Sequence, residues 1–158
     1  MPKKPLFFHM LPEMEKHYCM SMAVRAGDYL FIGGLTSTDD EGNEIHADDP
    51  AAQMKRIYEI LGSILPKSGG APRDVVSETI DYNVSVDEFN ETLFPHRQAF
   101  YGEEGPSVAG MEVVGFTSPA IRVETTAVAY LPRQTDTRHC DHAGSRISAP
   151  FGKILLAA

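Results

Sequence analysis

Five stretches of the chain are rich in β-branched, apolar and aromatic residues, or alternate between apolar and polar side chains, and this pattern predicts strands. They span residues 20–26, 29–33, 74–84, 105–114 and 120–131. Gly27-Asp28 separates the first two. Because glycine tolerates positive φ and aspartate bonds its own backbone, we expect a hairpin there. In the third stretch, Thr79, Asp81 and Asn83 share one side and give that strand a polar face.

Two helices are predicted between these strands. The first begins at the N-cap and first-turn proline Asp49-Pro50 and has an apolar face that runs through Leu65, after which Pro66 and Ser68-Gly69-Gly70 stop it. Its apolar face is formed at three- and four-residue steps by Ala51, Met54, Ile57, Tyr58, Leu61, Ile64 and Leu65. Ser85 and Glu88 fit a capping box for the second helix, which ends at Tyr101. Pro95 predicts that this helix either kinks or begins its regular part there.

The order strand, strand, helix, strand, helix, strand, strand predicts an α+β fold with both helices on one face of a mixed sheet. The opposite face is then left bare and is expected to pack against a partner. Outside the sheet, Phe7 and Phe8 of the N-terminal segment 1–17 are expected at a subunit junction. The tail, residues 133–158, fits either a docked segment or a poorly ordered appendage.

Composition indicates one globular domain, because a chain of 158 residues can bury a sizeable core. A net charge of −8 argues against nucleic acid as a partner, since that role needs clustered Lys and Arg. The two cysteines predict no disulfide framework, and no apolar run is long enough to span a membrane. No secretory signal is recognisable, so we expect a cytoplasmic protein.

No cofactor is expected, because the chain carries neither a phosphate-binding loop nor a dinucleotide fingerprint. His139-Cys140-Asp141-His142 is the one dense group of metal-ligating residues. Four ligands in a row cannot easily reach one ion without distorting the chain, so we predict no metal site.

The segments Ala23–Gly34, Gly105–Val114 and Ala120–Leu131 resemble the Rid (reactive intermediate deaminase, YjgF) family, whose members hydrolyse reactive enamines and imines. The resemblance implies a Rid-like domain at residues 18–132 with a chorismate mutase-like fold, in which two helices cover one face of a mixed six-stranded sheet. It also implies a homotrimer, with clefts for a small-molecule substrate between neighbouring subunits.

Glu124 matches the glutamate with which the family activates water. By pattern alone an exposed strand position explains Glu124 equally well, and the resemblance favours catalysis. The family's arginine, which grips the substrate carboxylate, is replaced by Val108, and its cysteine by Gly110. Gly34 matches a ligand-facing glycine, although paired glycines are also typical of a turn or bulge. Glu112 matches a motif glutamate and fits a structural or rim position.

Two polar side chains complete the predicted substrate site. Tyr18 lies two residues before Met20, which aligns with a ligand-facing tyrosine of the family, so Tyr18 is either a hydroxyl donor on the same strand side or a packed aromatic residue. Asn83 is the second polar partner. Without the family's arginine, either another cation binds the substrate's acid group or the substrate is not a simple 2-imino acid. The cations considered are Arg122, Arg97 and Arg25.

Family members that lack this arginine include 2-aminomuconate deaminase-like proteins. The resemblance therefore implies a deaminase, a hydrolase that releases ammonia from a small enamine or imine with a water activated by Glu124. The alternative is a non-catalytic member of the family that binds small metabolites or acts as a scaffold.

Overall fold

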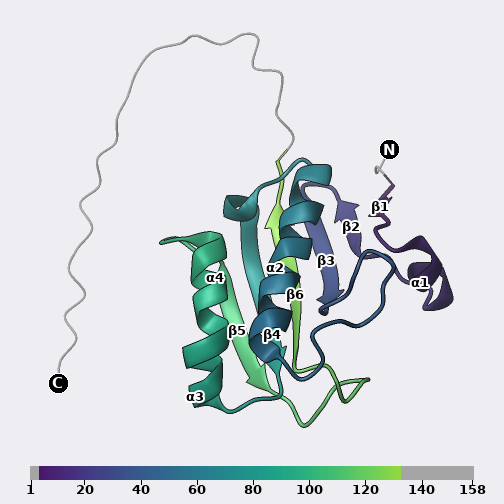
Figure 1. Ribbon diagram of the computed structural model, residues 1–158. Coiled ribbons are helices and arrows are strands. Elements are labelled where there is room, and N and C mark those ends of the chain that lie inside the picture. Colours follow the sequence, from purple (N-terminus) through teal and green to yellow (C-terminus); the bar gives the residue numbers. More distant parts are fainter. Residues whose placement is uncertain (1–3, 133–158) are drawn as a thin grey trace, which may run out of the picture.

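Six strands form one mixed sheet in the computed structural model, which describes residues 4–132 (Figure 1). The strands are β1 (Leu6–Phe8), β2 (Ala23–Ala26), β3 (Tyr29–Leu35), β4 (Val75–Tyr82), β5 (Ser107–Glu112) and β6 (Val123–Tyr130). Their order across the sheet is β1-β2-β3-β6-β4-β5, and only the pair β4 and β5 is parallel. The predicted α+β fold with a mixed six-stranded sheet is confirmed.

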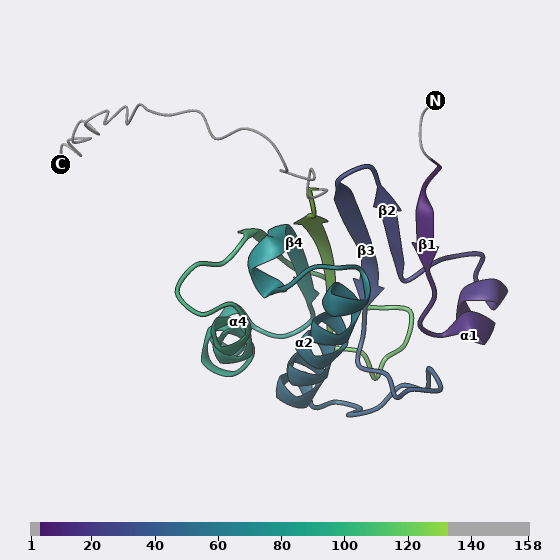
Figure 2. The same ribbon diagram turned by 90° about the horizontal axis from the view of Figure 1, so that it is seen from above.

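Two long helical segments cover one face of this sheet, as predicted (Figure 2). They are α2 (Pro50–Lys67) and a continuous run of α3 (Val86–Glu88), a π-helical turn η2 (Phe89–Leu93) and α4 (Phe94–Tyr101). A short helix, α1 (Pro12–His17), lies at the β1 end of the sheet, and a 3₁₀ turn, η1 (Pro72–Asp74), precedes β4. In residues 4–132 no helix has the length and apolar character needed to cross a bilayer.

Helix α2 begins where the sequence predicts and ends slightly later. The Asp49 side chain accepts a hydrogen bond from the Ala52 amide at 2.9 Å, and Pro50 occupies the first turn. The helix continues to Lys67, two residues past Leu65, and ends at Ser68, so of the predicted stop signals Pro66 lies inside the helix and Ser68-Gly69-Gly70 follows it. A proline in the last turn removes only its own donor, and the Ser68 amide still bonds back to the Ile64 carbonyl at 3.1 Å.

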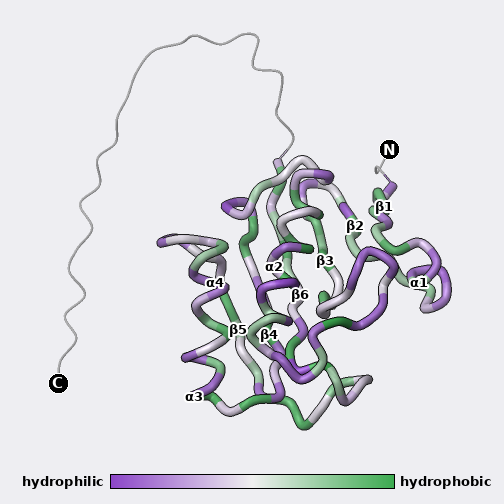
Figure 3. The backbone as a smooth tube through the Cα atoms, viewed as in Figure 1, coloured by the Kyte–Doolittle hydropathy of each residue, from purple (hydrophilic) through white to green (hydrophobic). Residues whose placement is uncertain are grey.

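The core lies between α2 and the sheet. The predicted apolar face of α2 is buried from Met54 to Leu65, and Gln53 is buried with it. Strand β6 alternates without interruption, with its odd-numbered residues from Val123 to Ala129 facing this core. Figure 3 shows the hydrophobic stretches that the central strands and α2 contribute.

The second helical run starts at Ser85, whose hydroxyl accepts a hydrogen bond from the Glu88 amide at 3.2 Å. Its regular part, α4, starts at Phe94, with Pro95 in the first turn. Of the two possibilities open at Pro95, the second is therefore confirmed. The π-helical turn before it accommodates the change of geometry.

A buried ion pair joins this run to the sheet. Glu78 on β4 is 2% exposed and accepts a hydrogen bond from Arg97 Nε of α4 at 2.8 Å. Its other oxygen accepts hydrogen bonds from the hydroxyls of Tyr58 at 3.1 Å and Tyr101 at 3.0 Å. Burial, followed by the charge of Glu78, raises the pKa of both tyrosines far above the usual value. All four polar side chains are therefore committed to holding α2 and α4 on the sheet.

The opposite face of the sheet, called here the open face, carries a row of apolar side chains. Phe7, Val24, Phe31 and Val128 are successive partners across β1, β2, β3 and β6. Phe7 is 60% exposed and Phe31 49% exposed. Within the described residues no helix covers this face, which agrees with the prediction of a bare sheet surface.

Candidate active site

Glu124 lies on the open face, directly against the backbone of Gly34. The pairing of β3 with β6 shifts register between Ile32 and Leu35, so Gly33 and Gly34 form a bulge opposite β6. A Cβ atom on Gly34 would lie 2.8 Å from Cδ of Glu124, closer than real Cβ contacts. Gly34 therefore lies in a bulge, one of the alternatives that the sequence left open, and only a residue without a side chain leaves space here for the Glu124 carboxylate.

Asp81 is the direct cross-strand partner of Glu124. Its Oδ1 atom is buried and has no hydrogen-bond partner among the described residues. Burial raises the pKa of the Glu124 carboxyl above its usual value, and the neighbouring charge of Asp81 raises it further. Asp81 was not among the predicted site residues. The available signal was its position between Thr79 and Asn83 on a polar strand face, but the partner strand was not evident from that pattern.

Asn83 and Arg122 lie opposite each other on the open face, two residues along their strands from Asp81 and Glu124. Arg122 Nη1 donates a hydrogen bond to Asn83 Oδ1 at 2.7 Å, and Asn83 Nδ2 donates to the Val113 carbonyl at 2.8 Å. Arg122 Nε also lies 3.3 Å from Asp48 Oδ1. These contacts hold the ends of β4, β5 and β6 together and keep a guanidinium one row from Glu124.

The other two arginines considered as substitutes for the missing cation serve the fold. Arg97 is paired with Glu78 between the helices and the sheet. Arg25 donates hydrogen bonds to the carbonyls of Ser68 at 3.3 Å and Leu131 at 2.7 Å, at the far end of β6 from Glu124. Of the three, Arg122 is the one that shares the face and the neighbourhood of Glu124.

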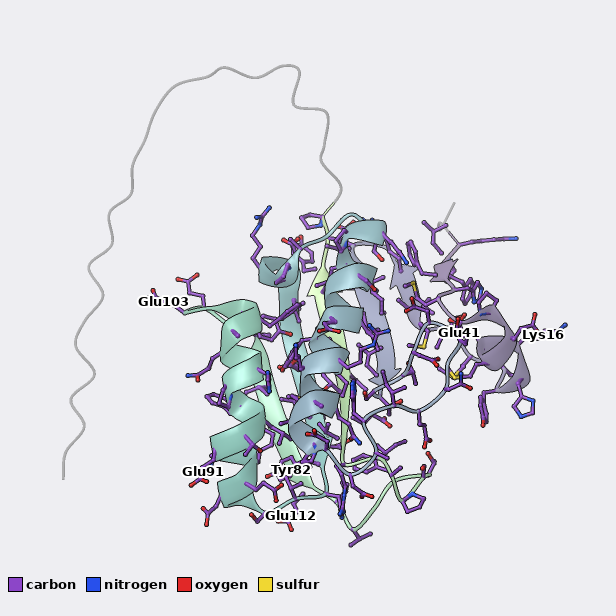
Figure 4. All side chains as sticks on the ribbon, viewed as in Figure 1. Lys16, Glu41, Tyr82, Glu91, Glu103 and Glu112 are labelled. Carbon is purple, nitrogen blue, oxygen red and sulfur yellow. The ribbon has the colours of Figure 1, made fainter. Side chains whose placement is uncertain are left out.

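The predicted β5 residues do not share the face of Glu124 within one chain. Val108, Gly110 and Glu112 pair in parallel register with Glu78, Ile80 and Tyr82, whose side chains face the helices. Tyr82 and Glu112 lie near each other at the same end of the sheet in Figure 4. All six residues of β5 are exposed, because β5 is an edge strand. The face that it presents to Glu124 carries Ala109 and Met111.

The strand argument for Tyr18 is wrong. Strand β2 begins at Ala23 rather than Met20, and Tyr18 caps the C-terminus of α1, where its side chain is 66% exposed. Cys19, which follows it, has a positive φ of 53°, which an extended strand does not allow. The buried Glu15 imposes this path, because its carboxylate accepts hydrogen bonds from the amides of Met22 at 2.6 Å and Leu11 at 3.2 Å.

Residues 10–131 match the family model described as endoribonuclease L-PSP. The chain belongs to this family. This match, together with relatives named as RutC family proteins, confirms the predicted resemblance to the Rid (YjgF) family.

Relatives of this endoribonuclease L-PSP family member align over most of their length. A RutC family protein of Pyrococcus abyssi is 28% identical over 130 residues, which cover 82% of this chain and 98% of the relative. The 3-aminoacrylate deaminase RutC of Acinetobacter baylyi is 26% identical over 115 residues, covering 69% of this chain and 84% of the relative. A crystal structure of a YjgF/YER057c/UK114 family member from Mycobacterium tuberculosis has a TM-score of 0.69 at 23% identity, covering 81% of this chain and 100% of that chain. This likeness confirms the fold.

A cavity of about 410 Å³ lies away from Glu124, between the N-terminal segment and α2. Its lining includes Met10, Arg56 and Lys67 and none of the predicted site residues. Residues 4–132 contain no group of three or more His, Cys, Asp or Glu arranged to hold a metal ion. The cluster His139-Cys140-Asp141-His142 lies outside the described residues, together with the rest of the predicted tail 133–158.

Proposed function

We propose that this protein is a deaminase that hydrolyses the C–N bond of a small enamine or imine, with Glu124 as the group that activates water. The observation that carries the proposal is the half-buried Glu124 carboxyl, seated against Gly34 and raised in pKa by burial. A carboxyl of raised pKa exchanges protons closer to neutral pH than an exposed one, which suits acid–base chemistry. The relative named 3-aminoacrylate deaminase supports the same chemical class.

The family model takes its name from an endoribonuclease, and charge argues against that activity here. The chain carries a net charge of −8, and the open face places Asp81 beside Glu124. Two adjacent carboxyl groups repel a phosphate backbone, which binds through clustered Lys and Arg. Hydrolysis of an uncharged or cationic nitrogen centre fits this arrangement better than RNA cleavage.

Arg122 is the side chain that we propose to contact a substrate's acid group in place of the arginine replaced by Val108. It lies on the same face as Glu124, and its partners Asp48 and Asn83 leave its side chain 37% exposed. A conjugated enamine diacid of the 2-aminomuconate type and a smaller amino acid-derived enamine are both compatible with one such cation. The site is proposed to lie between copies of the chain in a homotrimer, as the resemblance implies, with the apolar row of the open face in the contact.

The test is ammonia release above the spontaneous rate from 3-aminoacrylate, 2-iminopropionate and 2-aminomuconate. Glu124→Gln is expected to lower kcat by about 10²- to 10⁴-fold, because it removes the proton-transfer group. Glu91→Gln, an exposed change on η2 that Figure 4 places away from the sheet, is the matched control and should keep full activity. Arg122→Met should raise KM for the substrates that carry a carboxylate.

Two results would contradict this proposal, the first its function and the second its catalytic residue. If the wild type hydrolyses none of the three compounds, the non-catalytic metabolite-binding or scaffold role replaces it. If Glu124→Gln hydrolyses them as fast as the wild type while both proteins keep the same assembly, the deaminase activity does not use Glu124.

A further inference from the structure

We propose that Asp81 is a positioning residue of the same site: it forms a carboxylate pair with Glu124 that retains one proton, and this proton is used in the hydrolysis. This inference rests on the proposed deaminase function and adds to it a second acidic group and a source for the proton. It concerns residues of β4 and β6 that the sheet register brings together.

The geometry of the pair is set by the backbone. Asp81 and Glu124 are opposite residues in the antiparallel pairing of β4 with β6, and both side chains point to the open face. Side chains in such positions have Cβ atoms about 5 Å apart, so the charge of Asp81 acts on Glu124 at short range. The buried Oδ1 of Asp81 lacks a hydrogen-bond partner in the described chain.

The surroundings of the pair contain little to neutralise it. Strand β3 contributes the two glycines of its bulge, and β5 contributes Met111 beside Asp81. The nearest cation on this face is Arg122, one row away, and its guanidinium is engaged by Asn83 Oδ1 at 2.7 Å and Asp48 Oδ1 at 3.3 Å. The partly buried Glu124 carboxyl, with the charge of Asp81 beside it and no cation between them, does not ionise readily, because like charges repel strongly where water is scarce.

The retained proton has a defined use in the reaction. Starting as a carboxylic acid, Glu124 gives its proton to the enamine carbon, the C=C electrons form the new C–H bond, and the nitrogen lone pair forms the C=N bond of an iminium ion. The resulting carboxylate takes a proton from water as the water oxygen bonds to the iminium carbon. Glu124 then protonates the nitrogen, the C–N bond breaks, ammonia leaves, and the hydroxyl proton returns to Glu124.

Asp81 contributes through its charge and takes part in none of these proton transfers. A carboxylate beside Glu124 holds the proton on Glu124 in the resting protein and stabilises the positive iminium ion once it forms. With an imine substrate the first proton goes to nitrogen, and the remaining steps are the same. Each turnover consumes one enamine or imine and one water and yields one carbonyl compound and one ammonia.

The first measurement needs no substrate. The Glu124 carboxyl is titrated by ¹³C NMR in the wild type and in Asp81→Asn, with its signal assigned from the spectrum of Glu124→Gln. The pKa of Glu124 should fall in Asp81→Asn, because the neighbouring charge is removed while the burial stays. Asp87→Asn, at an exposed position of α3, makes the same chemical change elsewhere and should leave the pKa unaltered. An unchanged Glu124 pKa in Asp81→Asn would overturn the proposal.

The second measurement is the pH profile of kcat for the best substrate. In Asp81→Asn the limb at which activity falls with rising pH should move to lower pH, with a loss of about tenfold at neutral pH and recovery in acid. A purely structural role would lower activity at all pH values and leave this limb in place, which would overturn the proposal. Asp81→Ser, judged folded by an unchanged melting curve, is the second variant and should shift the limb in the same direction.

The two measurements separate this inference from the proposed function. If the wild type releases no ammonia, the proposed function fails and the catalytic use of the proton fails with it. The titration would still report by itself whether the two carboxyls are coupled. If the wild type is active and the titration shows no coupling, the deaminase function stands and the role of Asp81 is rejected.

Discussion

Replacing Gly34 with alanine tests whether the position of the Glu124 carboxylate against the Gly34 backbone matters for function. A Cβ atom at this position would lie 2.8 Å from Cδ and 3.3 Å from Cγ of Glu124, and its nearest atoms all belong to that side chain. Ordinary van der Waals contact begins at 3.4 Å, so the carboxyl carbon has to move by at least about 0.6 Å. The φ of Gly34 lies outside the left-handed region, so the backbone itself accepts alanine.

The expected effect is large on activity and small on stability. Misplacing a reacting group by about 1 Å can cost roughly 10²-fold in rate, so Gly34→Ala should lower kcat/KM by about 10- to 100-fold. The free energy of unfolding should fall by only about 1 kcal/mol, the cost of one rotamer adjustment of Glu124, because a flexible side chain rather than the backbone moves. The assay is ammonia release, with thermal melting measured on the same preparations.

Gly33→Ala is the matched control. Its Cβ would lie 3.6 Å from the carbonyl oxygens of Met22 and Ser21, which is ordinary contact, so activity should be retained. The double variant Gly34→Ala with Glu124→Ala completes the argument, because without the glutamate side chain the alanine meets no close neighbour and its destabilisation should vanish. Equal destabilisation in both backgrounds, or equal losses of activity at Gly33 and Gly34, would refute the reasoning.

Two further predictions concern the buried ion pair and the open face. Glu78→Gln should lower the free energy of unfolding in urea by about 3–5 kcal/mol, because Arg97 loses its buried counter-charge. The control Glu91→Gln should change it little. A loss below about 1 kcal/mol in Glu78→Gln would contradict a structural role for the pair. Phe31→Asp should convert the proposed trimer to monomers, as measured by light scattering, because it places a charge in the apolar row of the open face. The control Val86→Asp, at an exposed apolar position on α3, should leave the assembly unchanged. An intact trimer in Phe31→Asp would place the subunit contact elsewhere.

Local patterns in the sequence were sufficient for most of the secondary structure. The stripe of α2, its start at Asp49-Pro50 and the hairpin at Gly27-Asp28 all follow from interactions between residues a few positions apart. Strand β1 and helix α1 were not predicted, because three and six residues are too few to establish a hydrophobic period. They form because β1 pairs with β2 and because Glu15 bonds the Leu11 and Met22 amides.

The candidate site also combines features that local sequence predicts with features that depend on tertiary pairing. The sequence left Glu124 as either an exposed strand residue or a catalytic group, and the glycine pair before Leu35 is typical of a turn or bulge; the structure places Glu124 away from the core residues Val123 and Thr125. Only the tertiary structure decided that Gly34 seats the Glu124 carboxyl and that Asp81 stands beside it. The physical reason is that period two assigns a side chain to a face, whereas the neighbours on that face depend on strand order and register, which are set by packing between distant segments.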